Sequence, residues 1–554
     1  MNFISPFNSL TDRRAARFPW PERIILCLAV LISYASVWPN EFVFDDNFLI
    51  VKNSFLKSWA GLPDIFTHLN FAGNGQASGF YRPVPMLLHF IIYQVFGAST
   101  IAFHALNLGL QTINACLLHH FAIRAGFKRG AAFAAALLWA VHPLHSEAVA
   151  YMSSTPELLW ATFLLLGLII PLPDFTPSKM AQAAVFFILA LGSKETAVVF
   201  PALVAVTLFF ISKDRKQLST YFKTWPLWLM AAAYITGWTI FIHKSGYSMD
   251  KTGDAAYFQE YTTNITNRIL TCLATLPVYA QLIIFPQSLH MERDFPISHT
   301  LLDWRTATGA MMTCVSLLQI LWGRLQKGLA LSFGVLWFAI ALSPATGIGF
   351  PINARLSEHW LYFPLMGLFL GIMQSLSGFF INREKMAQFI ILALSLLLGT
   401  ATFLQSEKWR NAETLYQSIQ QSGGFVQRMS DIVGLFYLKN GQFDKAIEQF
   451  QYLIDNPKGP ETAGPYQGLT HMRIAFALLG AHLDKDEIVT AYEILRVLPS
   501  SRRIPEAIGE FNKALESDPN CFWAHKFLAI IYRYQGKTAL AAAQEKLFNE
   551  HGTP

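Results

Sequence analysis

Charged residues are scarce in this sequence. Only 14% of its 554 residues are Asp, Glu, Lys or Arg, whereas 53% are hydrophobic, and the mean hydropathy is +0.34. A soluble domain carries about 25% charged residues, so the shortage of charge excludes an ordinary soluble protein. The chain instead has the composition of an integral membrane protein, and its 46 Phe and 14 Trp residues suit a bilayer-facing surface with aromatic belts.

Cysteine is also scarce, which excludes a disulfide framework or a cysteine-rich metal site. The five cysteines have no metal-ligand spacing and read as single buried thiols; they are Cys27, Cys116, Cys272, Cys314 and Cys521. Net charge is only +6, and most Lys and Arg fall in short loops between apolar segments. We therefore expect no nucleic-acid partner.

Apolar stretches of the length that spans a bilayer, roughly 17–25 residues with the shorter ones extended by their flanks, recur along the chain. They predict an all-α, polytopic membrane helix bundle. We expect eleven spans, at 24–39, 100–123, 131–150, 157–172, 180–193, 195–211, 225–243, 305–323, 328–344, 359–379 and 387–404. The first run ends in Trp-Pro-Asn without a small-residue cleavage site, so it reads as an uncleaved helix rather than a signal peptide.

Basic loops set the expected orientation, because Lys and Arg concentrate on the cytoplasmic side. The loops at 124–129, 213–216, 324–327 and 383–385 all become cytoplasmic if the N-terminus is cytoplasmic and eleven segments cross. Counting the apolar segment 265–286 as a twelfth span inverts the last two loops. We therefore expect that segment to be re-entrant or interfacial, and residues 405–554 to lie outside the cytoplasm.

The opposite, non-cytoplasmic side carries five polar clusters. Adjacent carboxylates, Asp45 and Asp46, follow the first span, where charge beside hydrocarbon costs a few kcal/mol per residue unless it finds water or a partner. The pair is either a functional acid pair or a polar stop that caps the next helix. The other clusters are Tyr81-Arg82-Pro83, His142 to Glu147, Ser193-Lys194-Glu195, and the stretch from Arg355 through Glu358, His359 and Tyr362 to Pro364. After Arg82, the apolar stretch 85–96 is too short to cross and reads as a surface helix.

The composition becomes that of a soluble helical region after the last span. Gly434, Tyr437, Gly441, Ala446 and Phe450, with Pro457 closing the unit, fit the 34-residue tetratricopeptide pattern. A second unit runs from Ala507 to Pro519, and the pattern restarts at 522–539. We therefore expect two domains, a membrane domain at 1–404 and a tetratricopeptide-type α-solenoid at 405–554; the alternative is a set of generic helical hairpins.

These motifs resemble, in order, those of the transmembrane and tetratricopeptide repeat-containing O-mannosyltransferases. The shared sequences are Phe-Val-Phe-Asp-Asp-Asn, Tyr-Arg-Pro, His-Pro-Leu-His-Ser-Glu-Ala-Val-Ala, Ser-Lys-Glu and Ser-Glu-His-Trp-Leu-Tyr-Phe-Pro, followed by the repeats. More distantly, the layout resembles the protein O-mannosyltransferases and the GT-C glycosyltransferase fold. The resemblance implies a hexosyltransferase that moves mannose or another hexose from a polyprenyl-phosphate donor to a Ser or Thr hydroxyl of a protein.

The resemblance also implies site roles. The first acid of the pair, Asp45, falls on the usual catalytic base, with Asp46 as a support that positions the acceptor or a cation such as Arg82. Members of that family usually carry Arg at the position of His359. This difference leaves open either the contact with the phosphate or the identity of the donor. Arg355, one turn earlier, is the candidate to replace that Arg.

The residues support this chemistry independently of the resemblance. A carboxylate is needed to take the proton of the acceptor hydroxyl, and cations are needed to hold the departing phosphate. The expected phosphate ligands are Arg82, Lys194, Arg355 and His359, with His142, His145, Glu147, Glu195, Glu358 and Tyr362 in supporting positions.

Several of these residues have structural alternatives. Arg82 reads equally as an interface anchor, and Lys194 and Glu195 as a pair that neutralise one another. His142 and His145 with Glu147 suggest a divalent metal, but no third ligand stands at a suitable spacing, which favours a hydrogen-bonded turn. No cofactor follows from the sequence.

Three other functions compete with this one. A transporter would place its polar residues near the bilayer midplane in broken helices, a membrane scaffold would bind partners through the repeats, and a related transferase would move an oligosaccharide or act on lipid or polysaccharide. The expected partners are the lipid-linked donor, a protein acceptor and membrane lipids. The short repeat array favours a bacterial inner membrane, with repeats in the periplasm; the alternative is the endoplasmic reticulum, with repeats in the lumen.

Overall fold

A computed structural model describes most of the chain. The described residues are 20–75, 78–172, 175–211, 221–244, 260–261, 263–293, 295–325, 329–349, 352, 354–380, 382–424, 427–456, 464–483 and 489–551. Within these ranges every regular element is a helix, which confirms the all-α prediction. Lys213, Arg215, Lys216, Lys327 and Pro457, which entered the topology and repeat predictions, lie outside them.

The described chain divides into two compact units: the first ends at Asn411, and the second consists of the residues from Ala412 onward together with Glu260. The sequence predicted a division at residue 405, but α18 (Glu384–Glu407) continues past it. Trp409 then stacks on Tyr151 with ring centroids 5.2 Å apart, and Glu41 donates its backbone N–H to the carbonyl of Arg410. Residues 405–411 are therefore held by the first unit.

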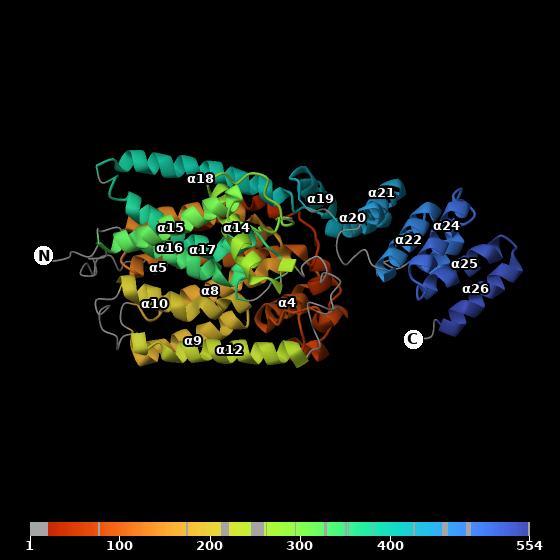
Figure 1. Ribbon diagram of the computed structural model, residues 1–554, viewed down its shortest axis with the longest axis horizontal. Helices are drawn as coiled ribbons and strands as arrows, with labels where there is room; N and C mark the ends of the chain where they lie inside the picture. The colour runs from red at the N-terminus through yellow and green to blue at the C-terminus, as the bar shows by residue number, and fades with distance from the viewer. Residues whose placement is uncertain are drawn as a thin grey trace. The chain divides into compact units, whose positions relative to one another are not determined.

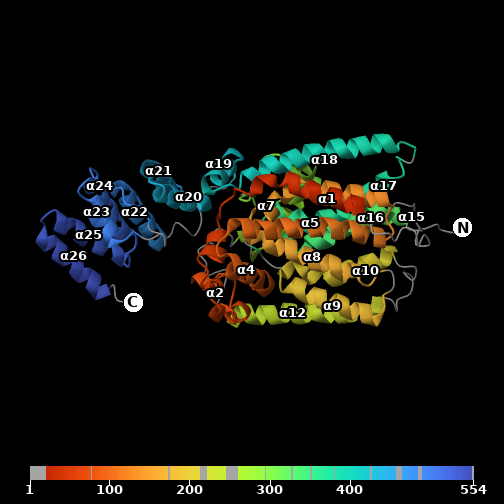
Figure 2. The same cartoon turned by 180° about the vertical axis from the view of Figure 1, so that it is seen from behind.

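The first unit is a bundle of long helices that run side by side, with short helices gathered in the connections (Figures 1 and 2). The long helices are α1 (Trp20–Ser33), α4 (Pro83–Phe96), α5 (Thr100–Arg124), α6 (Arg129–Ala140), α8 (Thr155–Ile169), α9 (Pro177–Leu191), α10 (Phe200–Ile211), α12 (Trp225–Lys244), α14 (Ile265–Ile284), α15 (Trp304–Leu325), α16 (Leu329–Leu342), α17 (Tyr362–Leu376) and α18. The short helices are η2 (Ala35–Val37), η3 (Asn47–Val51), α2 (Ser54–Lys57), η4 (Trp59–Gly61), α3 (Asp64–Thr67), η5 (Ala72–Asn74), η6 (Pro143–His145), α7 (Ser146–Ala150), η7 (Met152–Ser154), η8 (Glu195–Val199), η10 (Ser343–Thr346) and η11 (His359–Leu361).

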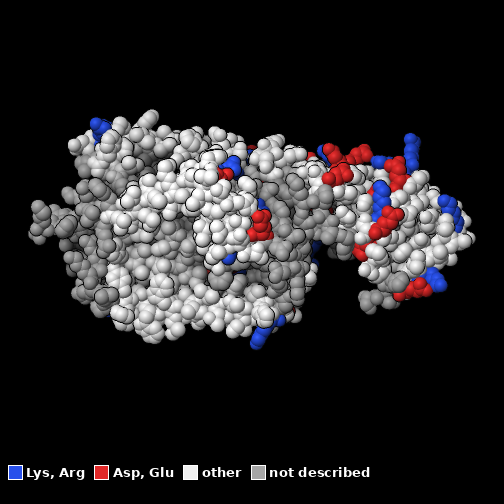
Figure 3. Space-filling view, in the orientation of Figure 1, with Lys and Arg blue, Asp and Glu red and all other residues white. Residues whose placement is uncertain are grey.

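Each of the eleven predicted spans contains a helix, but several are shorter than predicted. Six helical segments of the described chain are long and apolar enough to cross a membrane: Thr100–Arg124, Met152–Ile169, Trp225–Lys244, Ile265–Ile284, Leu329–Thr346 and Glu384–Glu407. By contrast, α6 has 12 residues and α1 has 14. On the face drawn in Figure 3, the second unit carries many charged residues and the bundle few, as expected for a bundle surrounded by lipid.

The predicted span 131–150 is broken, which corrects the sequence analysis. Helix α6 ends at Ala140, and His142 adopts an extended backbone with φ −78° and ψ 129°. The cause is Pro143, because proline disfavours helical backbone at the residue before it and has no N–H of its own to donate. The chain then proceeds through η6, α7 and η7 before α8 begins.

The bundle has two ends that the hydrogen bonds identify. At the basic-loop end, Arg124 donates to the carbonyl of Leu172 and the N–H of Lys128 donates to the side chain of Gln374. At the other, which we call the site end because it holds Asp46 and His359, Asn40 donates to the carbonyl of Ser406. The ends of α5 and α8 therefore lie together at the basic-loop end, and those of α1 and α18 lie together at the site end.

Helix α14 is long and apolar enough to cross, yet both of its ends are bonded to the site end. Near its start, Arg268 donates to the carbonyl of Gly347, 3.0 Å away. At its last turn the carbonyl of Ile283 lies 3.0 Å from Nε2 of His142. Of the two alternatives for 265–286, these contacts favour a helix that lies along the site end.

Polar side chains of α5 satisfy the backbone groups that the broken helices leave open. Gln111 donates to the carbonyl of Ala140 at the end of α6, Asn107 donates to the carbonyls of Val149 and Tyr151, and Asn114 donates to that of Leu158. Unsatisfied backbone groups cost several kcal/mol in a membrane. These amides therefore stabilise the irregular chain between α6 and α8.

The second unit consists of paired helices. They are α19 (Ala412–Gln421), α20 (Gln427–Lys439), α21 (Phe443–Asp455), α22 (Gly464–Leu479), α23 (Ala491–Val497), α24 (Ile504–Ser517), α25 (Phe522–Tyr534) and α26 (Thr538–His551). Gly441 and Gly536 close the turns of the α20–α21 and α25–α26 pairs with φ of +71° and +73°, and Ala446 and Phe450 are fully buried. The helix pairs and their matching turns agree with a repeat, and the tetratricopeptide assignment stays a prediction.

Candidate functional site

The acidic pair lies in a tight turn after η2. Phe44, the residue before the pair, has a left-handed backbone with φ +49°, a conformation that strains a residue with a Cβ atom and that clusters at functional sites. Backbone N–H groups of Asp46, Asn47 and Phe48 donate to carbonyls at Val43, Phe44 and Asp45. These backbone hydrogen bonds fix the conformation of the turn that carries Asp45 and Asp46.

Asp46 is fully buried and both of its carboxylate oxygens are engaged. Oδ1 accepts from the N–H and the hydroxyl of Ser153, at 2.7 and 2.6 Å, and Oδ2 accepts from the N–H of Val43 at 3.1 Å. Burial raises the pKa of Asp46 to about 7, although these hydrogen bonds act in the opposite direction. Asp46 therefore joins the 43–46 turn to η7. The resemblance suggested that Asp46 positions a cation such as Arg82, but its hydrogen bonds are with Ser153 and Val43.

Asp45 is placed differently, since it is only partly buried. Its backbone N–H donates to the hydroxyl of Tyr151, 3.0 Å away, and that ring stacks on Trp409. The turn and Tyr151 thus fix the backbone of Asp45, a residue that stays partly exposed.

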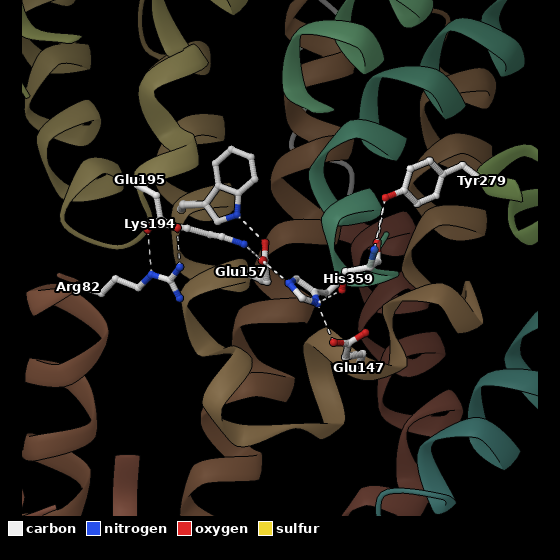
Figure 4. Close-up of polar contacts among 9 residues, drawn as sticks. Arg82, Glu147, Glu157, Lys194, Glu195, Tyr279 and His359 are labelled. Atoms are coloured by element: carbon white, nitrogen blue, oxygen red, sulfur yellow. Dashed lines mark hydrogen bonds and ion pairs between the residues drawn. The ribbon is translucent and has the colours of Figure 1, made fainter. Parts of the chain in front are cut away.

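Arg82 and Glu195 form a two-pronged ion pair (Figure 4). Nε donates to Oε2 at 3.0 Å and Nη2 to Oε1 at 2.6 Å, while the guanidinium stacks over Phe80 with its carbon 4.4 Å from the ring centroid. The N–H of Arg82 donates to Asn70. Arg82 is thus held by charge on one side and by an aromatic ring on the other, rather than extended as an interface anchor.

Lys194, Glu157, His359 and Glu147 form a continuous charge network in Figure 4. Lys194 pairs with Glu157, whose other oxygen accepts from the indole of Trp160 at 2.9 Å. His359 lies between two carboxylates, with Nδ1 2.6 Å from Oε1 of Glu147 and Nε2 3.6 Å from Oε1 of Glu157. Lys194 and Glu195 therefore have separate charged partners, which contradicts the alternative in which they pair together.

Exposure differs sharply within this network. The side chains of Glu157, Lys194 and Glu147 are 5–7% exposed, whereas that of His359 is 26% exposed. Burial lowers the pKa of Lys194 to about 7, and the nearby Arg82 guanidinium acts in the same direction. His359 is thus the accessible member of a buried cluster.

A second ion pair adjoins the network through the residue before His359. Glu358 accepts from Nε of Arg293 at 2.8 Å and from the N–H of His290 at 3.0 Å. Burial raises the pKa of Glu358 to about 7, against the opposing effect of Arg293. Ser357 and Tyr279 hold the backbone at this point, with the hydroxyl of Tyr279 3.4 Å from the carbonyl of Ser357.

Other predicted site residues contact the backbone or neighbouring side chains. Arg355 donates to the carbonyl of Phe295. His142 accepts from the N–H of Leu144 at 3.3 Å and so caps η6, while His145 packs between the rings of Trp139 and Tyr362. The hydroxyl of Tyr362 lies in the bundle core and donates to Gln111. Among the described residues, no three His, Cys, Asp or Glu side chains are placed to hold a metal.

One segment connects the parts of the site. Between Glu147 and Glu157 the chain supplies a partner to His359, to the N–H of Asp45, to Asp46 and to Lys194. Glu157 is four positions after Ser153, so their Cα atoms lie at most about 14 Å apart. Sequence reasoning missed Tyr151, Ser153 and Glu157; the only signal for Glu157 was an acid at the start of an apolar run.

The chain is similar to several curated transferases. It is 25% identical over 408 residues to Protein O-mannosyl-transferase F38B6.6 of Caenorhabditis elegans, which covers 71% of this chain and 57% of that protein. It is 25% identical over 458 residues to Protein O-mannosyl-transferase TMTC4 of Mus musculus, covering 72% of this chain and 62% of that protein. With Protein O-mannosyl-transferase TMTC1 of Homo sapiens it shares 26% identity over 445 residues, or 71% and 50% of the two chains.

No protein-family model matches the chain, and no solved structure matches it. The matched region spans about half to three fifths of the length of these relatives. The curated proteins to which this chain is similar over most of its length are thus named as protein O-mannosyl-transferases, which agrees with the resemblance seen in its motifs.

Proposed function

We propose that this chain is a membrane glycosyltransferase that moves mannose or another hexose from a polyprenyl-phosphate donor to a Ser or Thr hydroxyl of a protein. The relatives are named for transfer of mannose to protein, and the site holds both an acidic pair and a row of cations. The lipid-linked donor follows from the GT-C resemblance and from the position of the site at one end of an apolar bundle.

The observation that carries this proposal is the division of the acidic pair. Asp46 is fully buried and accepts three hydrogen bonds from Ser153 and Val43, whereas Asp45 is partly exposed on a backbone fixed by Tyr151. Asp45 is therefore the base, and Asp46 is the anchor that holds the turn. As the acceptor oxygen bonds to the anomeric carbon, its proton passes to Asp45 and the bond from that carbon to the phosphate oxygen breaks.

Cations near the donor would stabilise the charge that develops on the departing phosphate. Arg82 uses Nε and Nη2 for Glu195, and an Arg side chain has further donors for a second anion. Lys194 is adjacent to Glu195 in the chain and lies against the Glu157 oxygen that faces His359. We place the phosphate against Arg82, Lys194 and His359, and assign Arg355 to the loop that carries His359.

The second unit is proposed to present the protein acceptor or a partner. Helical repeats of this kind bind extended peptides or helices along a concave face. We place this unit on the periplasmic side of a bacterial inner membrane, or on the lumenal side of the endoplasmic reticulum, because its chain follows an odd number of predicted spans.

Purified protein in detergent tests the function directly. Polyprenyl-phosphate mannose is supplied with a Ser/Thr-rich acceptor peptide, and both released polyprenyl phosphate and glycosylated peptide are measured. Mannose on the peptide, dependent on Asp45, is the expected result. Lipid release with transfer only to a glycan acceptor would favour a polysaccharide-directed transferase, and no release from any polyprenyl-phosphate sugar would contradict the proposal.

A further inference from the structure

His359 combines exposure with placement between two carboxylates. Its side chain is 26% exposed, and Glu147 and Glu157, which face its two ring nitrogens, are buried. The two contacts are unequal, because Nδ1 is within hydrogen-bond distance of Glu147 while Nε2, at 3.6 Å from Glu157, is beyond it. Nδ1 is therefore held by Glu147. Nε2 lies near the Glu157 carboxylate but is not hydrogen-bonded to it, so Nε2 is able to bond a ligand.

The cluster around His359 contains more carboxylates than basic side chains. From Arg82 to Glu147 the site contains two basic side chains, Arg82 and Lys194, and three carboxylates, Glu195, Glu157 and Glu147. An N–H on each ring nitrogen of His359 would face Glu147 or Glu157 and offset part of this negative charge. Such a ring suits a site where an anionic donor has to bind.

We infer that His359 is the proton donor to the departing lipid phosphate, a role that rests on the proposed transferase function. As the glycosidic bond breaks, its electron pair moves to the phosphate oxygen, and the Nε2 proton of His359 passes to that oxygen. The ring becomes neutral and keeps its Nδ1–H bond to Glu147. Asp45 gains the acceptor proton and His359 loses one, so the site returns to its starting state by exchange with water.

The charged and titratable groups around His359 come from several elements. Glu147 approaches from α7, Glu157 from α8 and Lys194 from the residue before η8, while Glu358, the chain neighbour of His359, is paired with Arg293. His142 and His145 lie in η6, which packs on η11. Among these groups Lys194 is the competing donor, because burial lowers its pKa to about 7.

Rate against pH, measured on the full-length enzyme, separates the two donors. With polyprenyl-phosphate mannose and an acceptor peptide, wild-type kcat should fall at alkaline pH, where a proton donor is lost. His359→Arg keeps a positive charge that does not titrate, so it should retain the donor KM, lose the alkaline fall and have a reduced kcat. His359→Gln should reduce kcat about 100- to 10,000-fold, the usual contribution of a general acid. Lys194→Arg, the matched control, should keep the alkaline fall.

The outcomes distinguish this inference from the function on which it rests. Loss of the alkaline fall in Lys194→Arg but not in His359→Arg would make Lys194 the donor, and a wild-type profile that stays flat to high pH would overturn proton donation, even if the His359 variants fail to fold. In both cases transfer by the wild type would leave the transferase intact. Absence of transfer by the wild type at every pH would instead refute the function.

Discussion

Replacing each member of the acidic pair by asparagine should have opposite consequences for stability and turnover. Asp45→Asn removes a base and leaves intact the backbone bond to Tyr151. Asp46→Asn changes a fully buried side chain that accepts from two backbone N–H groups and one hydroxyl. An amide has one acceptor oxygen, so its NH2 group must face a backbone donor at Ser153 or Val43.

The magnitudes follow from these contacts. A buried donor left without an acceptor costs about 1–3 kcal/mol, so Asp46→Asn should lower the free energy of unfolding by that amount and loosen the strained turn at Phe44. Loss of a general base costs about 100- to 10,000-fold in rate, so Asp45→Asn should abolish most turnover, and it should destabilise the protein less than Asp46→Asn because Asp45 is only partly buried. Ser153→Ala, which removes only the hydroxyl bond to Asp46, should fall between wild type and Asp46→Asn in stability.

The assay pairs release of polyprenyl phosphate with thermal unfolding in detergent for the four proteins. We expect Asp46→Asn to unfold at a lower temperature than Asp45→Asn and to keep a partial rate, and Asp45→Asn to have almost no turnover. An inactive Asp46→Asn beside an active Asp45→Asn would exchange the two roles. Wild-type turnover in both variants would reduce the pair to a boundary marker and refute the mechanism.

Three further predictions concern the rest of the chain. A reporter fused after Arg410 should be active only outside the cytoplasm, and cytoplasmic activity would mean that an even number of segments crosses before it. Removal of 412–554 should impair modification of a protein acceptor and spare slow hydrolysis of the donor; loss of both in a folded first unit would contradict acceptor presentation. Gly371→Ala should lower the unfolding temperature, because its Cβ would lie 2.7 Å from the carbonyl of Ala330 and 2.9 Å from Cα of Gly334. Gly109→Ala on α5 is the matched control, since nothing lies within 4 Å of its Cβ; equal stability of the two variants would refute close packing of α16 on α17.

Helix positions could be predicted from the sequence because apolar length is a local property. The predicted spans at 100–123 and 225–243 differ from α5 and α12 by one residue at an end. The end of α6 before His142 could also have been predicted, since Pro143 follows it in the sequence. The apolar residues on both sides of Pro143 instead led to the prediction of one continuous span. Hydropathy averages over a window and therefore conceals one residue that ends a helix.

The partners within the site could not be predicted in the same way. Arg82 and Glu195 are 113 positions apart, and Glu147 and His359 are 212 apart. Their pairing depends on how helices pack, not on local spacing. Ser153 was missed because half of its contribution is a backbone N–H, which every residue except proline possesses, so the sequence carries no distinguishing signal for it.

The break at Pro143 has a consequence for how the site is assembled. One continuous helix from Arg129 to Ala150 would direct its side chains around a single axis, and would carry the residues after it away from the acidic turn. Because the helix ends at Ala140, the segment from Glu147 to Glu157 supplies Glu147 to His359, Ser153 to Asp46 and Glu157 to Lys194. Asn107 and Gln111 stabilise this irregular path by donating their side-chain N–H groups to its open carbonyls. The proposed base, its anchor and the phosphate-side network are therefore attached to one stretch of chain, so displacement of that stretch would disturb both halves of the site together.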